Sequence, residues 1–541
     1  MSPSQLQSDI TPPSPDLLVN GEKIVTTSSD ESLVVASNLP SHREQRAPGG
    51  EPEDLITEET NPEVLALDFS SSKKWMILTV IFLVQTSMNF NTSLYANGQA
   101  GMAKAFNVSH QTTVTGAAVF LITYAFGCEL WAPWSEELGR RCVLQGSLLL
   151  VNLCCLPVAL ASPNGITSIL VGRAFGGLFS AGGSVTLGMV ADMFPAGKQE
   201  HPLAFIVLSS VGGSIVGPII GGYIETYLPW QWTIWMQLIF GVFVQLLHFV
   251  LVPETRATVR LNAHAKYLRK TGVKPAAYGP SEHKTWRQYL MPREMLTIWL
   301  RPFQMFITEP IVSVLSALSG FSDALIFMQI QSFGRVFQLW DFSIVQTGLA
   351  FIPIGIAYIL AYLLFIPVIR HNRQLRIQNP GSEHAQFESR LWWLLYAAPC
   401  LPIGLLIFAW TSTASVHWIA PMVGCVFIGV ANYTIYMTTI DYMVAAYGPY
   451  SASATGGNGF ARDFLAGVLT WFANPYYDSF QGKLGLQTAN TILACISLVL
   501  VAATFVVYFK GPSMRRRSTL AQSLLTALSQ TSGIAPSNDT I

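Results

Sequence analysis

The sequence predicts an all-α membrane protein in which twelve transmembrane helices form two pseudo-symmetric halves of six. The first observation is composition: 51% of the 541 residues are apolar and 11% are charged, whereas soluble domains carry about 25% charged residues. The second is a mean hydropathy of +0.40. The third is a series of apolar runs of about 20 residues, the length that crosses a hydrocarbon core. Equal numbers of basic and acidic residues, 31 each, leave no overall positive field for nucleic acid.

The first 72 residues differ from the rest of the chain. They contain thirteen Asp and Glu, eight Pro and only three Lys and Arg. Such a segment cannot bury enough apolar surface to offset its ordering entropy. We therefore predict a disordered acidic tail, and the absence of a basic segment followed by a short apolar one argues against a cleaved signal peptide.

From Trp75 onward, twelve apolar runs follow one another. Inside lipid every backbone amide must find a partner within its own segment, so each run is expected to be a helix. The predicted spans are 75–95, 112–133, 143–161, 166–190, 203–223, 231–252, 310–333, 343–368, 391–411, 417–440, 453–474 and 486–509.

The basic residues predict that both termini are cytoplasmic. Of the 31 Lys and Arg residues, only Lys104, Arg335 and Lys483 fall in the predicted outer loops, and basic residues concentrate in cytoplasmic loops. An even number of spans then returns the chain to the side on which it began. The predicted segments are an acidic tail (1–72), an N-terminal six-helix bundle (73–252), a central loop (253–309), a C-terminal six-helix bundle (310–509) and a C-terminal tail (510–541).

Two halves of similar length suggest internal duplication, the usual plan of a transporter that rocks about a midplane site. The central loop contains the string "RLNAHAKYLRKTG" (260–272), in which basic and apolar residues alternate. An amphipathic helix on the inner membrane surface and a solvated linker both fit this string. The sequence leaves the two open.

Between the second and third spans stands "APWSEELGRRCV" (132–143). A short turn with an acid, a glycine and paired arginines can latch neighbouring helix ends through charge-assisted hydrogen bonds. Here the chain resembles the major facilitator superfamily, whose loop at this place carries a G-x-L-x-[DS]-E-x-x-G-R-R pattern. In the family an acid at the inner end of span 4 pairs with this loop, and Asp192 is the matching position. The other matching residues are Ser135, Glu136, Gly139, Arg140 and Arg141.

The fourth span contains an arginine, Arg173, in "LVGRAFGGLFSAGG". An unpaired cation at membrane depth costs roughly 2.5–3.5 kcal/mol on insertion scales, so Arg173 should face the bundle interior and have a partner. An arginine in span 4 followed by small residues resembles the family's second motif, which implies a role in proton coupling. The alternative is an arginine that only ties helices together.

The fifth span contains "GGSIVGPIIGGYI" (212–224), in which Gly213, Gly217 and Gly221 repeat every four residues and share one helix face. Such a face allows another backbone to approach closely, and Pro218 bends the helix. The whole string, including Gly222, resembles the G-x-x-x-G-P-x-x-G-G signature of the proton-antiporter branch of the superfamily. The resemblance implies export in exchange for protons.

Further strings resemble particular branches of the family. "PETRATVRLNAHAKYLRKTG" (253–272) and "RPFQMFITEPIV" (301–312) are similar to the central loop of fungal twelve-span drug:proton antiporters. "LSGFSDALIF" (318–327) and "PYSASATGGNGFARDFLAG" (449–467) resemble a fungal subgroup that includes plasma-membrane citrate and other organic-acid exporters. The same subgroup includes many multidrug or polyamine-like members.

Charged and polar residues inside the spans are the candidate substrate and proton pathway. Asp323 lies near the middle of span 7 and can take up a proton or pair permanently with an arginine. Arg462 can bind a carboxylate if span 11 begins near Ser453, but it lies at the interface if "SASATGGNG" is an inner loop. Neutral groups complete the pathway candidates: Asn89, Gln329, Asn432 and Tyr436. Asn107 in "NVS" is a possible glycosylation site.

The sequence carries no phosphate-binding loop, metal-ligand cluster or catalytic triad, so we expect no enzyme activity, no metal and no cofactor beyond a proton gradient. We predict a monomeric plasma-membrane transporter that exports a small organic molecule, for example an anion, by alternating access. Subgroup resemblance favours an organic acid such as citrate. Multidrug, polyamine or secondary-metabolite efflux remains open, as does a nutrient sensor that binds without transporting.

Overall fold

A computed structural model describes residues 54–161, 165–180, 182–282, 292–380, 382–447, 450–480, 482 and 484–518. All of them belong to the unit Gly50–Ile541. Most of the tail predicted to be disordered, residues 1–53, and the last part of the predicted C-terminal tail, residues 519–541, lie outside the described residues.

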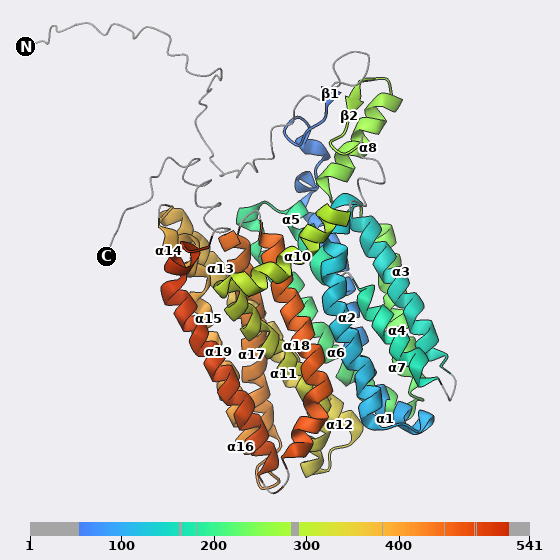
Figure 1. Ribbon diagram of the computed structural model, residues 1–541, viewed down its shortest axis with the longest axis vertical. Coiled ribbons are helices and arrows are strands. Elements are labelled where there is room, and N and C mark those ends of the chain that lie inside the picture. Colours follow the sequence, from blue (N-terminus) through green and yellow to red (C-terminus); the bar gives the residue numbers. More distant parts are fainter. Residues whose placement is uncertain are drawn as a thin grey trace, which may run out of the picture. The chain divides into compact units, whose positions relative to one another are not determined.

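The first six predicted spans correspond to helices on one side of the bundle (Figure 1). The fourth span consists of two helices, because the chain leaves the helix near Phe179 and resumes it at Gly182. The helices are α1 (Ser71–Phe106), α2 (His110–Glu137), α3 (Arg140–Ala159), α4 (Ile166–Leu178), α5 (Gly182–Met193), α6 (Glu200–Tyr227) and α7 (Gln231–Leu251).

The last six predicted spans correspond to helices on the other side (Figure 1). Spans 8 and 9 are each built from two successive helices, and a short helix, α14 (Glu383–Gln386), and the 3-10 helix η5 (Glu388–Arg390) precede span 9. The spanning helices are α11 (Pro310–Phe337), α12 (Ile344–Leu349), α13 (Ile352–Gln378), α15 (Trp392–Ala397), α16 (Cys400–Thr411), α17 (Ile419–Tyr447), α18 (Ser451–Ser479) and α19 (Gly485–Arg515).

Ten helical stretches in the described part of the chain are long and apolar enough to cross a membrane. The other two predicted spans fall short for physical reasons: span 4 is interrupted, and α18 carries Arg462 and Asp463 in its middle. The prediction of an all-α membrane protein is confirmed. We call the end at which α1, α3 and α6 begin the basic end, because it carries Lys73, Lys74, Arg140, Arg141, Arg376, Arg390 and Arg515.

The central segment is more structured than a loop. It contains α8 (Ala257–Lys270), β2 (Ala277–Tyr278) and α10 (Pro292–Thr308). The string that the sequence left open between a linker and a surface helix is therefore helical. One face of α8 is buried against the chain itself, through Leu261 and Ala265.

The predicted disordered tail is wrong for its last part, because residues 54–70 are folded. β1 (Asp54–Leu55) pairs in parallel with β2, and the 3-10 helices η1 (Pro62–Val64) and η2 (Ala66–Asp68) follow. Ile56 and Leu65 are buried with α8 in one apolar cluster. The prediction was made from the average composition of residues 1–72, in which these few apolar residues carry little weight. The structure thus joins the segment before α1 to the segment after α7.

The glycine face of α6 receives α1. A Cβ atom added to Gly217 would lie 2.0 Å from Ser93 Oγ, and one added to Gly221 would lie 2.1 Å from Asn97 Oδ1. Gly213 likewise packs against the α1 backbone. Only glycine leaves room for such an approach.

The proline–glycine part of the same motif faces the other half of the chain. A Cβ at Gly222 would lie 3.0 Å from the Ile344 carbonyl oxygen, and a Cβ at Gly348 would lie 2.6 Å from the Pro218 carbonyl oxygen. Helix α6 therefore packs closely on α1 within its own half and on α12 across the interface between the halves.

Candidate functional site

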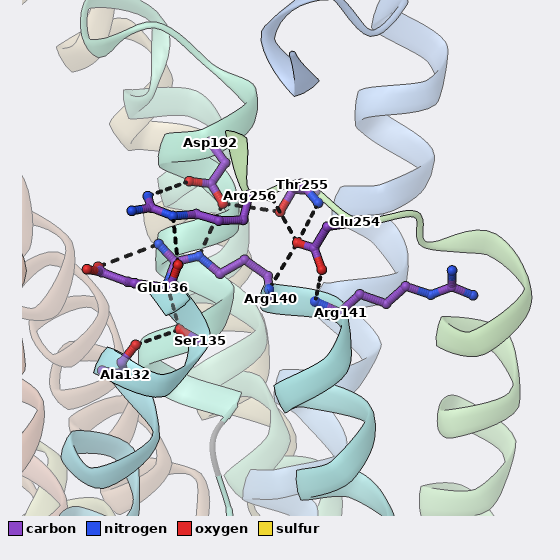
Figure 2. A network of polar contacts seen from close by, with 9 residues as sticks. All are labelled: Ala132, Ser135, Glu136, Arg140, Arg141, Asp192, Glu254, Thr255 and Arg256. Carbon is purple, nitrogen blue, oxygen red and sulfur yellow. Dashed lines mark hydrogen bonds and ion pairs between the residues drawn. The ribbon is translucent and has the colours of Figure 1, made fainter. Parts of the chain in front are cut away.

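The turn between α2 and α3 forms a latch at the basic end (Figure 2). The Arg140 guanidinium donates from Nε to Asp192 Oδ2 at 3.1 Å and from Nη1 to Ser135 Oγ at 2.6 Å. Glu136 lies farther away, with Oε1 3.7 Å from Arg140 Nη2. Gly139, the residue before Arg140, has φ +100°, a backbone conformation that residues with a side chain rarely adopt. The structure therefore brings together the residues that the family pattern singled out.

Sequence reasoning missed the acid that closes this latch, Glu254 (Figure 2). Its carboxylate accepts hydrogen bonds from the backbone amides of Arg140 at 3.0 Å and Arg141 at 3.1 Å. An anion at the first turn of α3 also complements the helix dipole. Thr255 and Arg256 follow it and contact Asp192, at 3.2 Å and 3.8 Å. The available signal was an acid directly after the apolar run of span 6.

The middle of the bundle holds a central charge cluster: Asp323 on α11 and Arg462 with Asp463 on α18. Arg462 Nη2 donates to Asp463 Oδ1 at 3.0 Å, and its Nε lies 3.8 Å from Asp323 Oδ2. The guanidinium also lies over the Tyr436 ring, 4.1 Å from its centre. All three charged side chains are buried. Because α18 begins at Ser451, Arg462 lies within the helix, not in an inner loop.

The central charge cluster also contacts the N-terminal half. Arg462 Nη1 donates to Ser210 Oγ on α6 at 3.3 Å, and Gln85 Nε2 on α1 donates to the same oxygen at 3.3 Å. The side-chain oxygen Oε1 of Gln85 and the Tyr124 hydroxyl are also buried there. Polar groups from both halves therefore converge around Arg462.

Glu129 on α2 is a further buried carboxylate, 7% exposed. It belongs to α2, as the latch does, but it faces α18: a Cβ at Gly456 would lie 2.6 Å from Glu129 Oε2. Within the described residues Glu129 makes no ion pair. An acid inside an apolar run was the signal for it, and such acids mark ion or substrate pathways.

Arg173 lies inside the N-terminal half, away from the central charge cluster. Its Nη1 donates to Asn91 Oδ1 at 2.6 Å, and its Nε donates to the Gly116 carbonyl oxygen at 3.3 Å. The Tyr95 and Phe120 rings face the guanidinium at 4.4 Å and 4.1 Å. The partners of Arg173 are thus neutral, and in the described part of the chain no carboxylate pairs with it.

The remaining predicted residues lie in different places. The Asn89 side chain donates to the backbone carbonyl oxygen of Gln85 at 3.1 Å. The Asn432 side chain donates to Ser322 Oγ at 3.0 Å, next to Asp323. The side-chain nitrogen and oxygen of Gln329 are both buried without a hydrogen-bond partner among the described residues. Asn107 is exposed after the last residue of α1, at the end opposite the basic end.

A second set of charges joins the two halves at the basic end. Glu200 on α6 pairs with Arg376 on α13 and, at 3.4 Å, with Arg390 before α15. Arg390 Nη1 also lies 2.5 Å from Asp441 Oδ1 on α17. We call these four residues the basic-end network. Sequence reasoning missed it, because charges at span edges resemble ordinary loop charges.

Within the described residues no group of three or more His, Cys, Asp and Glu side chains could hold a metal ion. The central charge cluster and the basic-end network present carboxylates and guanidinium groups, and a hydroxyl and an amide lie beside the central cluster. Such groups can exchange protons and hydrogen-bond a small molecule, and a contact between halves at membrane mid-depth is where transporters bind cargo.

Comparisons with known proteins agree on the family. The family model described as Major Facilitator Superfamily matches residues 78–470. The MFS-type transporter paaT of Penicillium rubens is 31% identical over 472 residues, which are 86% of this chain and 83% of that protein. The MFS-type transporter kojT of Aspergillus flavus is 29% identical over 469 residues, covering 83% and 79%.

Solved structures show the same fold. The proton:xylose symporter XylE, bound to a bromodeoxyglucose, aligns with a TM-score of 0.56 at 15% identity. The alignment covers 81% of this chain and 96% of that one. The human organic anion transporter MFSD10 aligns with a TM-score of 0.50 at 17% identity, covering 79% and 99%.

Proposed function

This chain belongs to the major facilitator superfamily, and we propose that it exports a small organic molecule across the plasma membrane in exchange for protons. The observation that carries the proposal is the central charge cluster, which combines two carboxylates with one guanidinium in the C-terminal half and contacts the N-terminal half through Ser210. A carboxylate that loses its cation partner at membrane depth favours the protonated form. Rearrangement around Arg462 would therefore couple proton uptake to the movement of the halves.

The charge balance bears on the cargo. With both carboxylates ionised, Asp323 and Asp463 outnumber Arg462, and Glu129 adds a further acid on α2. An arginine that already lies between two acids is a poor receptor for a third. Aromatic rings and hydroxyls near it, from Tyr436 and Tyr124, suit a ring-containing, hydrogen-bonding compound. We therefore favour a neutral or cationic cargo, such as a secondary metabolite, drug or polyamine.

An organic acid such as citrate is the second candidate. It is supported by the resemblance of "PYSASATGGNGFARDFLAG" to exporters of such acids and by the depth of Arg462 in α18. This cargo requires Asp323 or Asp463 to be protonated when the acid binds, so that Arg462 is free to accept a carboxylate.

We also propose the orientation and assembly predicted from the sequence: the basic end in the cytoplasm, with both termini there, and a chain that works as a monomer. The latch and the basic-end network supply many of the positive charges at this end. Cytoplasmic loops carry such an excess. Reporter fusions to the two termini that report opposite sides of the membrane would refute this orientation.

Two steps test the function. Metabolite profiling of the medium of host cells with and without the chain identifies the exported compound, and proteoliposomes loaded with that compound, or with labelled citrate, then measure efflux under an imposed pH gradient. We expect outside acid to accelerate efflux, the variant Asp323→Asn to lose this acceleration, and Asp341→Asn, at an exposed loop position, to keep it. Efflux that ignores the gradient refutes antiport, and binding without flux supports a sensor.

For Arg173 we expect a result different from that for Asp323 in the same transport assay. Because its partners are neutral groups within one half, we expect Arg173→Ala to lower the stability and the rate of transport while the response to the pH gradient persists. If Arg173→Ala folds normally and loses only the response of transport to the pH gradient, Arg173 is part of the proton pathway.

A further inference from the structure

Helix α10 has two kinds of surface. Its inner side packs on α2, α11 and α18 at the basic end, and Met305 is fully buried there. Figure 1 shows α10 running across the ends of these helices. Its outer side exposes Leu296, Leu300 and Ile307, which are 50%, 53% and 80% accessible.

The outer side of α10 has an apolar line and an adjoining polar line. Spacings of four and seven residues put Leu296, Leu300 and Ile307 along one line of the helix. Gln304 and Thr308, which are also exposed, follow the adjoining line. A helix that lies in the plane of a membrane surface needs such an arrangement, with one edge toward acyl chains and the next toward water.

The inner side of α10 closes the seam between the halves. The Phe303 ring contacts the Phe460 ring of α18 at 4.7 Å and stacks with the Phe126 ring of α2 at 6.3 Å. The Pro302 carbonyl oxygen would lie 3.0 Å from a Cβ at Gly457. The adjacent residue of α18, Gly456, faces Glu129. Helix α10 therefore covers the basic-end side of the seam at the place where a buried acid lies.

We propose that α10 is anchored in the basic-end leaflet of the bilayer, with Leu296, Leu300 and Ile307 among phospholipid acyl chains, and that this contact keeps the seam between α2 and α18 closed. The occupant is a phospholipid bilayer because α10 crosses the ends of spanning helices (Figure 1), and Phe126 of α2, which contacts Phe303 of α10, is itself an exposed apolar side chain. Separation of α2 from α18 requires the Phe126–Phe303–Phe460 contacts to part. The leaflet that holds α10 therefore biases access to Glu129 from the basic end.

The first test locates the exposed line. Full-length protein in which Cys142 and Cys495, the exposed cysteines, are replaced by Ser receives one new cysteine, Leu300→Cys or Thr308→Cys, and a bimane label. In proteoliposomes we expect phospholipids with brominated acyl chains to quench the label at position 300 severalfold more than at 308. Aqueous iodide should show the opposite order. A label at 300 that iodide reaches as well as at 308, or that neither agent quenches, overturns the anchoring.

The second test follows the seam without relying on transport. Amide hydrogen exchange in nanodiscs is compared for the double variant Leu300→Gln/Ile307→Gln and for the control Gln304→Ala. We expect severalfold faster exchange in the basic-end turns of α18 in the double variant only. Unchanged exchange there, with the label at 300 in lipid, overturns the closing role and leaves the proposed antiport untouched.

Discussion

Replacing Gly139 with Ala should open the latch selectively. Gly139 has φ +100° and ψ 146° at the start of α3, a region that is essentially restricted to glycine. A Cβ there would also lie 2.4 Å from Glu254 Oε2. Glu254 cannot move away freely, because its carboxylate accepts from the backbone amides of Arg140 and Arg141.

The cost of the substitution follows from this geometry. A residue held in a disfavoured backbone region costs of the order of 1–3 kcal/mol. The chain can relieve the strain only by turning the Gly139 peptide, which separates Glu254 from the α3 amides. An energy of about 1–3 kcal/mol applied to the closed latch raises the population of the open latch by about 5–150-fold.

Amide hydrogen exchange measures this shift directly. The peptide that contains the Arg140 and Arg141 amides should exchange faster in Gly139→Ala by the same factor, because exchange requires loss of the Glu254 hydrogen bonds. Gly146→Ala, on the same helix and with no atom within 4 Å of the added Cβ, is the control and should exchange like the wild type. Equal exchange in the two variants would show that Glu254 does not depend on the glycine conformation.

Two further substitutions test the packing and charge contacts. Gly217→Ala places a Cβ 2.0 Å from Ser93 Oγ and should cost about 1–3 kcal/mol by overpacking, whereas Gly212→Ala, with open space around it, should melt like the wild type in scanning fluorimetry. Glu200→Gln removes a buried acid that two arginines share and should cost about 3–5 kcal/mol. Asp478→Asn, in which the Asp478 side chain is 64% exposed and its partner Arg335 is 37% exposed, should cost less than about 1 kcal/mol. Similar melting temperatures for these two variants would refute the contribution of the basic-end network.

Hydropathy predicted the helices well, because lipid imposes the same demand on every span. It could not predict that span 4 is broken near Phe179 or that spans 8 and 9 are each assembled from two helices, since such breaks depend on what neighbouring helices offer. It also treated residues 253–309 as a loop. Helices α8 and α10 there are stabilised by packing on other parts of the chain, which an average over composition does not contain.

The site was predicted in part. The family pattern identified Arg140 and Asp192, and the depth of Asp323 and Arg462 suggested a pathway, but pairing between distant helices is invisible in a sequence. Ser210, which contacts Arg462 across the halves at 3.3 Å, is one serine among many in apolar helices. Arg173 shows the opposite case: its sequence context suggested a role in proton coupling, whereas aromatic faces and neutral oxygens surround it.

The contacts between the halves differ from end to end, and this difference bears on how the chain would move. At the basic end they combine the ion pairs of Glu200 and its two arginines with ring contacts of Phe126 to Phe303 and Phe460. At the opposite end they are neutral: Gly348 packs on the Pro218 carbonyl, and Gln111 donates to the Trp471 carbonyl at 2.7 Å. Ionic contacts tolerate water when they separate, because water solvates both partners. Close glycine packing is lost steeply with distance. We therefore expect the ion pairs of Glu200 to separate gradually and the contact between Gly348 and Pro218 to part in a single step.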